Sequence, residues 1–124
     1  MIIGLGIDMI EVDRVQEKLD KHNGFREKIF SPSEIKFCDR QTNKSENYAA
    51  RFAAKEAFLK ASGYGLQLGF ELADIEVIHD VLGKPSIKLA GHFVQEAVKN
   101  NWNKIHLSLS HLKSIACAVV IIEQ

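Results

Sequence analysis

An uninterrupted stretch of strong helix formers occupies the middle of the chain. Residues 48–61 read YAARFAAKEAFLKA and contain neither proline nor glycine. Because alanine, leucine, lysine, arginine and glutamate have the highest helix propensities, this composition predicts one long central helix. Alanines recur along one side of the helix at steps of three or four residues, so we expect a slim face against which another element packs closely.

Charged residues form two separate stripes on this predicted helix. Glu56 and Lys60 lie one turn apart on the first stripe, and Arg51 and Lys55 lie one turn apart on the second. The simplest interpretation of Glu56 and Lys60 is an ion pair between neighbouring turns, worth roughly 0.2–0.5 kcal/mol. For Arg51 and Lys55, a phosphate or subunit contact and an ordinary surface stripe both stay open.

The segments before the central helix predict one strand and two helices. Residues 2–7 are a short apolar run with glycines at positions 4 and 6, typical of a buried strand that another element approaches closely. Residues 11–20 repeat apolar side chains at helical spacing. Residues 31–34 read SPSE, a capping box with proline at the first helical position, so the next helix is expected to run to about residue 40.

After the central helix the apolar pattern changes to that of strands. Residues 75–79 and 86–89 flank a turn and predict a hairpin, residues 91–101 predict a helix, and residues 105–110 alternate between apolar and polar side chains. Residues 115–122 are nearly all apolar, as expected for a central strand covered on both faces. The sequence therefore predicts an α+β fold, in which helices pack on an antiparallel sheet that the N-terminal strand joins.

The composition of the chain argues against several classes of function. The 124 residues, expected to form a single domain over 1–124, carry 16 basic and 16 acidic side chains and no formal net charge. No overall field attracts an acidic membrane, and the interleaved charges give little support for nucleic-acid binding. No apolar run is long enough to cross a membrane, and the first residues lack the pattern of a signal peptide. Cys38 and Cys117 form no pairing pattern, so we expect reduced thiols and a cytoplasmic protein.

Two carboxylates on different rigid elements are candidates to hold a metal ion. Asp8 follows the predicted first strand, and Glu56 lies on the central helix. Magnesium is commonly held by one or two carboxylates, with water and substrate phosphate oxygens completing its octahedron. Lys60 would then place a positive charge near the same phosphates. A second interpretation of Asp8 is a cap for the helix that follows it, and the two roles are compatible.

Two further places offer polar chemistry. Ser110 and His111 end an alternating strand, and Lys84 lies in a tight turn. A structural histidine and a solvated turn residue are the alternatives for His111 and Lys84. The G-x-x-x-x-G-K-[ST] motif of nucleotide triphosphate binding is absent from the sequence, and the glycines at positions 4 and 6 lack the third glycine of a dinucleotide fingerprint.

The same residues carry a resemblance to a known family. The segments GIDMIEVDR (6–14), FSPSE (30–34), RFAAKEAFLK (51–60), GKP (83–85) and SLSH (108–111) occur in the order found in holo-[acyl-carrier-protein] synthases. These are the small, single-unit 4′-phosphopantetheinyl transferases. The resemblance covers nearly the whole chain. It departs at Ile115, where the family often has a tyrosine.

The resemblance implies a fold and a reaction. The fold would be 4′-phosphopantetheinyl transferase-like, and the 4′-phosphopantetheine arm of coenzyme A would pass to a serine of apo acyl carrier protein, with release of adenosine 3′,5′-bisphosphate. Asp8 and Glu56 would be the ligands of Mg²⁺, which bridges to the coenzyme A pyrophosphate, and Lys60 would contact phosphate. The general base stays open among Glu56, Lys60 and a metal-bound water.

The resemblance also implies partners. The family's small members are homotrimers with three sites at subunit boundaries. One subunit would contribute the metal-site residues Asp8, Glu56 and Lys60. Its neighbour would contribute the nucleotide and phosphate pocket, made of Lys84, Ser110 and His111. The acidic carrier protein would dock near the first helix, and the candidate cations are Arg14, Arg26 and Lys28. A solvated face is the alternative for these cations.

Two other functions remain open from the sequence. One is a binding module for coenzyme A or a carrier protein that has kept the fold without turnover. The other is a metal-dependent hydrolase of nucleotide pyrophosphates, in which water attacks in place of a serine. Because Asp8, Glu56 and Lys60 are all present, the transferase is the favoured function.

Overall fold

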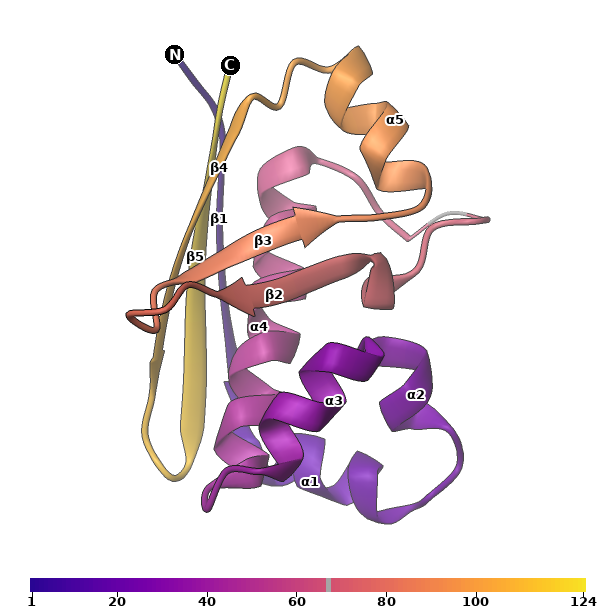
Figure 1. The fold of residues 1–124 in the computed structure, drawn as a ribbon, viewed down its shortest axis with the longest axis vertical. Helices are drawn as coiled ribbons and strands as arrows, with labels where there is room; N and C mark the ends of the chain where they lie inside the picture. The colour runs from indigo at the N-terminus through magenta and orange to yellow at the C-terminus, as the bar shows by residue number, and fades with distance from the viewer. Residues whose placement is uncertain (67) are drawn as a thin grey trace.

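The computed structural model describes residues 1–66 and 68–124, so Gln67, which falls after the predicted central helix, lies outside the described residues. The fold is α+β, as predicted. Three antiparallel strands form the main sheet in the order β1 (Ile2–Glu11), β5 (Ile115–Glu123) and β4 (Lys104–His111). The long helix α4 (Lys44–Ser62) packs along one face of this sheet, chiefly on β1 and β5 (Figure 1).

The remaining elements surround α4. The predicted hairpin is confirmed as β2 (Ile75–His79) and β3 (Pro85–Leu89), which contact α4 and β4 respectively. Three short helices gather near the N-terminal half of α4, and they are α1 (Val12–Asp20), α2 (Phe25–Ile29) and α3 (Pro32–Asp39). The helix α5 (His92–Lys99) lies near the other end of α4 (Figure 1), where Phe93 packs on Phe58.

Glycines in β1 allow α4 to approach the strand closely. A β-carbon added at Gly6 would lie 2.0 Å from the carbonyl oxygen of Ala57, and one added at Gly4 would lie 1.9 Å from that of Ala61. Real β-carbons do not come this near to a backbone atom, so the strand needs glycine at both positions. Two separate predictions, a slim alanine face on the helix and a strand approached closely at its glycines, are therefore confirmed, and the structure shows that the two elements pack on each other.

The first strand is longer than predicted, and one of its faces is exposed. We expected it to end at Ile7, but pairing with β5 continues from Asp8, opposite Ala118, to Glu11, opposite Ile115. Asp8 therefore lies inside the strand, because β5 supplies hydrogen-bond partners beyond the apolar run. Asp8 does not cap the next helix either, since the N-cap residue of α1 is Glu11.

On β1 and β5, the face of the sheet away from α4 is apolar. Leu5 and Ile7 are 65% and 56% exposed, and each is paired with an apolar residue of β5 on the same face. The strand was expected to be buried, and in the isolated chain this side is not covered. We call this surface the outer sheet face, and its apolar members are Ile3, Leu5, Ile7, Met9, Val119 and Ile121.

Arg51 and Lys55 are buried, so the interpretation of a surface stripe is wrong for both. Residues of α3 and of the β2 strand cover the side of α4 that faces away from the sheet. The Lys55 ammonium donates to Glu34 Oε1 at 2.7 Å and to the carbonyl oxygens of Leu72 and Ile75 at 3.0 and 2.7 Å. Burial lowers the pKa of Lys55, and the negative charge of Glu34 opposes that shift.

The predicted capping box is confirmed. Ser31 and Glu34 form both hydrogen bonds of the capping box at the start of α3. Gly63 ends α4 in the left-handed region with φ at 76°. Cys38 and Cys117 are free thiols. Among the described residues, none of the helices has both the length and the apolar content to cross a membrane.

Candidate active site

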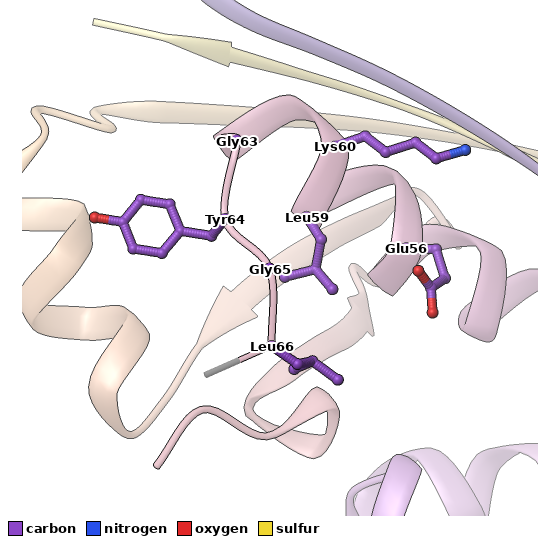
Figure 2. Close-up of a pocket in the computed structure, with 7 residues that line it drawn as sticks. All are labelled: Glu56, Leu59, Lys60, Gly63, Tyr64, Gly65 and Leu66. Carbon is purple, nitrogen blue, oxygen red and sulfur yellow. The ribbon is translucent and has the colours of Figure 1, made fainter. Parts of the chain in front are cut away.

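Asp8, Glu56 and Lys60 come together where α4 crosses β1. The Lys60 ammonium donates to Asp8 Oδ1 at 3.1 Å and to the carbonyl oxygen of Ile7 at 3.0 Å. Glu56 lies one turn earlier, and its side chain extends from the same side of the helix (Figure 2). The structure thus pairs Lys60 with Asp8, a residue of the neighbouring strand, in place of the expected pair with Glu56.

The electrostatics of this corner favour a bound cation. Partial burial raises the pKa of Glu56, and the negative charge of Asp8 raises that pKa further, while Lys60 opposes both. Two neighbouring carboxylates repel each other unless a positive charge lies between them. Lys60 meets part of this need, and a divalent cation would meet the rest.

Two cavities meet at Glu56. The first has a volume of about 480 Å³ and lies beside the end of α4 (Figure 2); its lining residues are Glu56, Leu59, Lys60, Gly63, Tyr64, Gly65 and Leu66. The second has a volume of about 390 Å³; its lining residues are Asp8, Met9, Ile10, Glu11, Arg14, Phe52, Glu56 and Ile115. Because Glu56 alone among the described residues lines both cavities, two molecules can approach this carboxylate from different sides.

The carboxylates fit a magnesium site that substrate completes. Asp8 is held in a strand and Glu56 in a helix, so both are on rigid elements. In the part of the chain that the structure describes, His, Cys, Asp and Glu form no group of three or more that could hold a metal. Magnesium accepts such a two-carboxylate arrangement when water and phosphate oxygens supply its other ligands.

His111 lies away from Asp8, Glu56 and Lys60 in the fold. It ends β4, and its Nδ1 atom is 2.8 Å from Glu46 Oε1 in the first turns of α4. Glu46 and Glu56 are ten positions apart in the sequence, which is about 15 Å along a helix. Ser110 pairs with Cys117 and His111 with Ala116, so their side chains leave opposite faces of the sheet. Within one chain, the hydroxyl and the imidazole therefore do not point to the same place.

Lys84 is also separate from the metal-site residues. It follows Gly83 in the turn of the hairpin, where its backbone N–H donates to Asp80 Oδ1 at 2.9 Å. Its side chain is exposed and lines neither of the two cavities. Within one chain, the structure thus brings together Asp8, Glu56 and Lys60 and leaves the predicted nucleotide pocket elsewhere.

The three candidate docking cations differ in position. Arg14 lines the second cavity, and its Nε atom is 3.4 Å from Glu11 Oε1 in an ion pair exposed to solvent. Arg26 is paired with Glu27 at 2.8 Å and with Asp39 at 3.4 Å. Lys28 is exposed on α2. Arg14 is therefore the candidate nearest to the carboxylates.

Two residues near these groups were not predicted. Glu46 gave no signal, because its partner His111 is far along the chain and only the fold joins them. Tyr64 lines the first cavity, while its hydroxyl donates to Glu96 on α5. Its place directly after the glycine that ends α4 was the one local signal that could have indicated it.

Comparison with known proteins gives the class of this protein. Residues 4–120 match the family model of the 4′-phosphopantetheinyl transferase superfamily. A holo-[acyl-carrier-protein] synthase of Syntrophus aciditrophicus is 45% identical over 124 residues, which cover 99% of this chain and 97% of that protein.

Solved structures agree with this class. The crystal structure of holo-[acyl-carrier-protein] synthase from Neisseria meningitidis has a TM-score of 0.92 at 30% identity, with 100% of each chain covered. The Bacillus anthracis enzyme in complex with CoA (3′,5′-ADP) has a TM-score of 0.80 at 37% identity, over 98% of this chain and 96% of that one. This chain belongs to the holo-[acyl-carrier-protein] synthases, a family of phosphopantetheinyl transferases.

Proposed function

We propose that this enzyme transfers the 4′-phosphopantetheine arm of coenzyme A to a serine hydroxyl of apo acyl carrier protein, in a Mg²⁺-dependent reaction that releases adenosine 3′,5′-bisphosphate. The observation that carries the proposal is the meeting of Asp8, Glu56 and Lys60 between two cavities. The family of the chain and the CoA complex of the Bacillus anthracis relative support the choice of substrates.

The bonds that change are few. The serine oxygen attacks the phosphorus that carries the pantetheine arm, and the bond from that phosphorus to the bridging pyrophosphate oxygen breaks. The proton of the serine leaves to a base, and the bisphosphate takes the electrons of the broken bond. Such phosphoryl transfer requires placement and charge neutralisation more than a covalent nucleophile on the enzyme.

The chain's own residues meet these two requirements. Asp8 and Glu56 would hold Mg²⁺, which when bound neutralises negative charge on the pyrophosphate. Lys60, held by the carbonyl oxygen of Ile7 and by Asp8, presents a fixed positive charge at the same place. The two cavities on either side of Glu56 allow donor and acceptor to enter from different directions, as an in-line displacement needs.

Intact-mass spectrometry tests this function. Apo acyl carrier protein incubated with the enzyme, coenzyme A and Mg²⁺ should gain the mass of one phosphopantetheine arm, and EDTA should prevent the gain. No gain while coenzyme A still binds would favour a binding module. Cleavage of coenzyme A without a carrier adduct would favour the pyrophosphate hydrolase.

We also propose that the enzyme is a homotrimer with its active sites at subunit boundaries. Two observations support this. The metal-site residues lie on the β1 side of α4, whereas His111 lies at its β4 side, so one chain does not bring them over one substrate. The outer sheet face is apolar and exposed in the isolated chain, which is typical of a surface that another subunit covers.

A charge on the outer sheet face should break the assembly. Leu5→Glu would bury an unpaired carboxylate between subunits, so we expect a monomer and loss of transfer. Light scattering coupled to size-exclusion chromatography measures the mass. Val98→Glu is the matched control, because Val98 is 78% exposed on α5, away from this face. An unchanged mass for Leu5→Glu would contradict the interface.

Arg14→Glu should weaken carrier binding. Arginine forms strong hydrogen bonds with carboxylates, and reversal of its charge beside the second cavity should raise the KM for an acidic carrier about tenfold, which corresponds to about 1.4 kcal/mol. The KM for coenzyme A should stay within about twofold. Lys36→Glu is the control, because Lys36 is an exposed cation on α3 that lines neither cavity. Equal carrier KM values for Arg14→Glu and the control would exclude Arg14 from docking.

A further inference from the structure

Glu46 holds the His111 ring by one of its two nitrogens. The His111 Nδ1 atom lies 2.8 Å from Glu46 Oε1, and the contact joins the end of β4 to the start of α4. The His111 side chain keeps 31% of its surface exposed and that of Glu46 keeps 18%. The ring is therefore fixed on one side by a carboxylate and open to a ligand on the other.

This contact determines what the open side can offer. When Nδ1 donates to a carboxylate, Nε2 is the nitrogen left for a ligand. Because Nδ1 then carries one proton, Nε2 can donate to an anion only when the ring carries both protons. With Glu46 on one side and a phosphate on the other, the imidazolium is the form that donates to both.

We propose that Glu46 is a positioning residue for the donor substrate, which holds His111 with Nε2–H directed at the 3′-phosphate of coenzyme A. This inference rests on the proposed function. Coenzyme A has three phosphates, and two form the pyrophosphate that reacts beside Asp8 and Glu56. The proposed trimer gives His111 to the nucleotide end of coenzyme A, where the ribose 3′-phosphate is the anionic group.

A carboxylate this close to an anion site requires a cation between them. Without His111, Glu46 would repel the phosphate. When the His111 ring carries both protons, the pair is neutral overall and Nε2–H is free to face the phosphate. Glu46 thus acts through His111 and does not touch the substrate.

Comparison of two donors tests this role. Glu46→Gln should raise the KM for coenzyme A about tenfold, as loss of a partner that orients a functional histidine typically does. Its kcat and its KM for 3′-dephospho-coenzyme A, which lacks the 3′-phosphate, should stay within about twofold of wild type, because only uniform binding to that phosphate is lost. Glu123→Gln is the matched control. It removes the carboxylate of a second histidine–glutamate pair, in which His106 Nε2 lies 2.6 Å from Glu123 Oε1. This substitution should change neither KM.

A double-mutant cycle separates positioning from packing. In a His111→Ala background, Glu46→Gln should no longer raise the KM for coenzyme A and should lower it, because a Glu46 carboxylate without the ring only repels the phosphate. An equal rise in KM for both donors would show a structural role and overturn the inference. An unchanged KM for coenzyme A in Glu46→Gln would overturn it too.

A binding measurement keeps the inference distinct from the proposed function. Calorimetry with adenosine 3′,5′-bisphosphate and with adenosine 5′-monophosphate measures the contribution of the 3′-phosphate without any transfer. Glu46→Gln should weaken the binding of adenosine 3′,5′-bisphosphate only. An equal loss of affinity for both ligands would contradict the inference. Absence of transfer by the wild-type enzyme would refute the proposed function and leave this comparison valid.

Discussion

Glu56→Gln should lower kcat/KM for carrier modification at least about a hundredfold and leave the fold intact. Metal-assisted charge neutralisation in phosphoryl transfer is worth several kcal/mol, and each 1.36 kcal/mol is about a tenfold change in rate. Glutamine keeps the shape of the side chain and removes the charge that would bind Mg²⁺. The half-buried position of Glu56 at the junction of both cavities makes it the carboxylate with the largest expected effect.

The measurement is transfer rate against Mg²⁺ concentration, followed by intact mass. Glu71→Gln is the control, because this exposed carboxylate lines neither cavity and should leave activity unchanged. Asp8→Asn should act in the same direction as Glu56→Gln. Wild-type activity and metal dependence in Glu56→Gln would remove Glu56 from the metal site.

Lys55→Met should lower the free energy of unfolding by about 3–5 kcal/mol, the range for breaking a buried ion pair from one side. The substitution leaves the Glu34 carboxylate buried without its ammonium partner. It also removes the donor to the carbonyl oxygens of Leu72 and Ile75. Methionine has nearly the same length as lysine, so the loss reports the charge and its hydrogen bonds more than the packing.

Urea denaturation measures this loss. Lys36→Met replaces an exposed lysine on α3 and should change the free energy of unfolding by less than about 0.5 kcal/mol. The Glu34 carboxylate also accepts from the backbone N–H groups of Ser31 and Val77, so its removal together with Lys55 should not restore full stability. A loss below about 1 kcal/mol in Lys55→Met would mean that the pair is not a main support of the fold.

The elements that the sequence predicted well have local signals. The composition of residues 48–61 predicted α4, and the SPSE segment predicted both the start of α3 and its capping box. Glycines at positions 4 and 6 predicted the close approach to β1. Each of these signals depends on neighbours in the chain, so no knowledge of the tertiary structure was needed.

The errors arise where partners come from distant segments. The length of β1 depends on pairing with β5 at the other end of the chain, and this extended the strand past Asp8. Lys55 looked like a surface residue because its partner Glu34 belongs to another helix. The neighbours Ser110 and His111 lie on opposite faces of the strand, so their adjacency in the sequence does not place their side chains together.

For the site, the residue pattern offered Asp8, Glu56 and Lys60 as candidates, the family resemblance favoured them, and the structure brings all three to one corner. Their roles in metal and phosphate binding stay predictions. The sequence motifs could not show that Glu56 lines two cavities or that Glu46 holds His111, because both facts depend on how α4 lies across the sheet.

The contact between Gly6 and Ala57 has a consequence for how the family can diverge. The backbone of Gly6 lies directly against the backbone of Ala57, so no side chain sets the distance between β1 and α4 at this point. Substitutions elsewhere in the interior can accumulate and compensate one another while Asp8 stays at the same separation from Glu56. This contact therefore fixes the distance between β1 and α4, on which the positions of Asp8 and Glu56 depend.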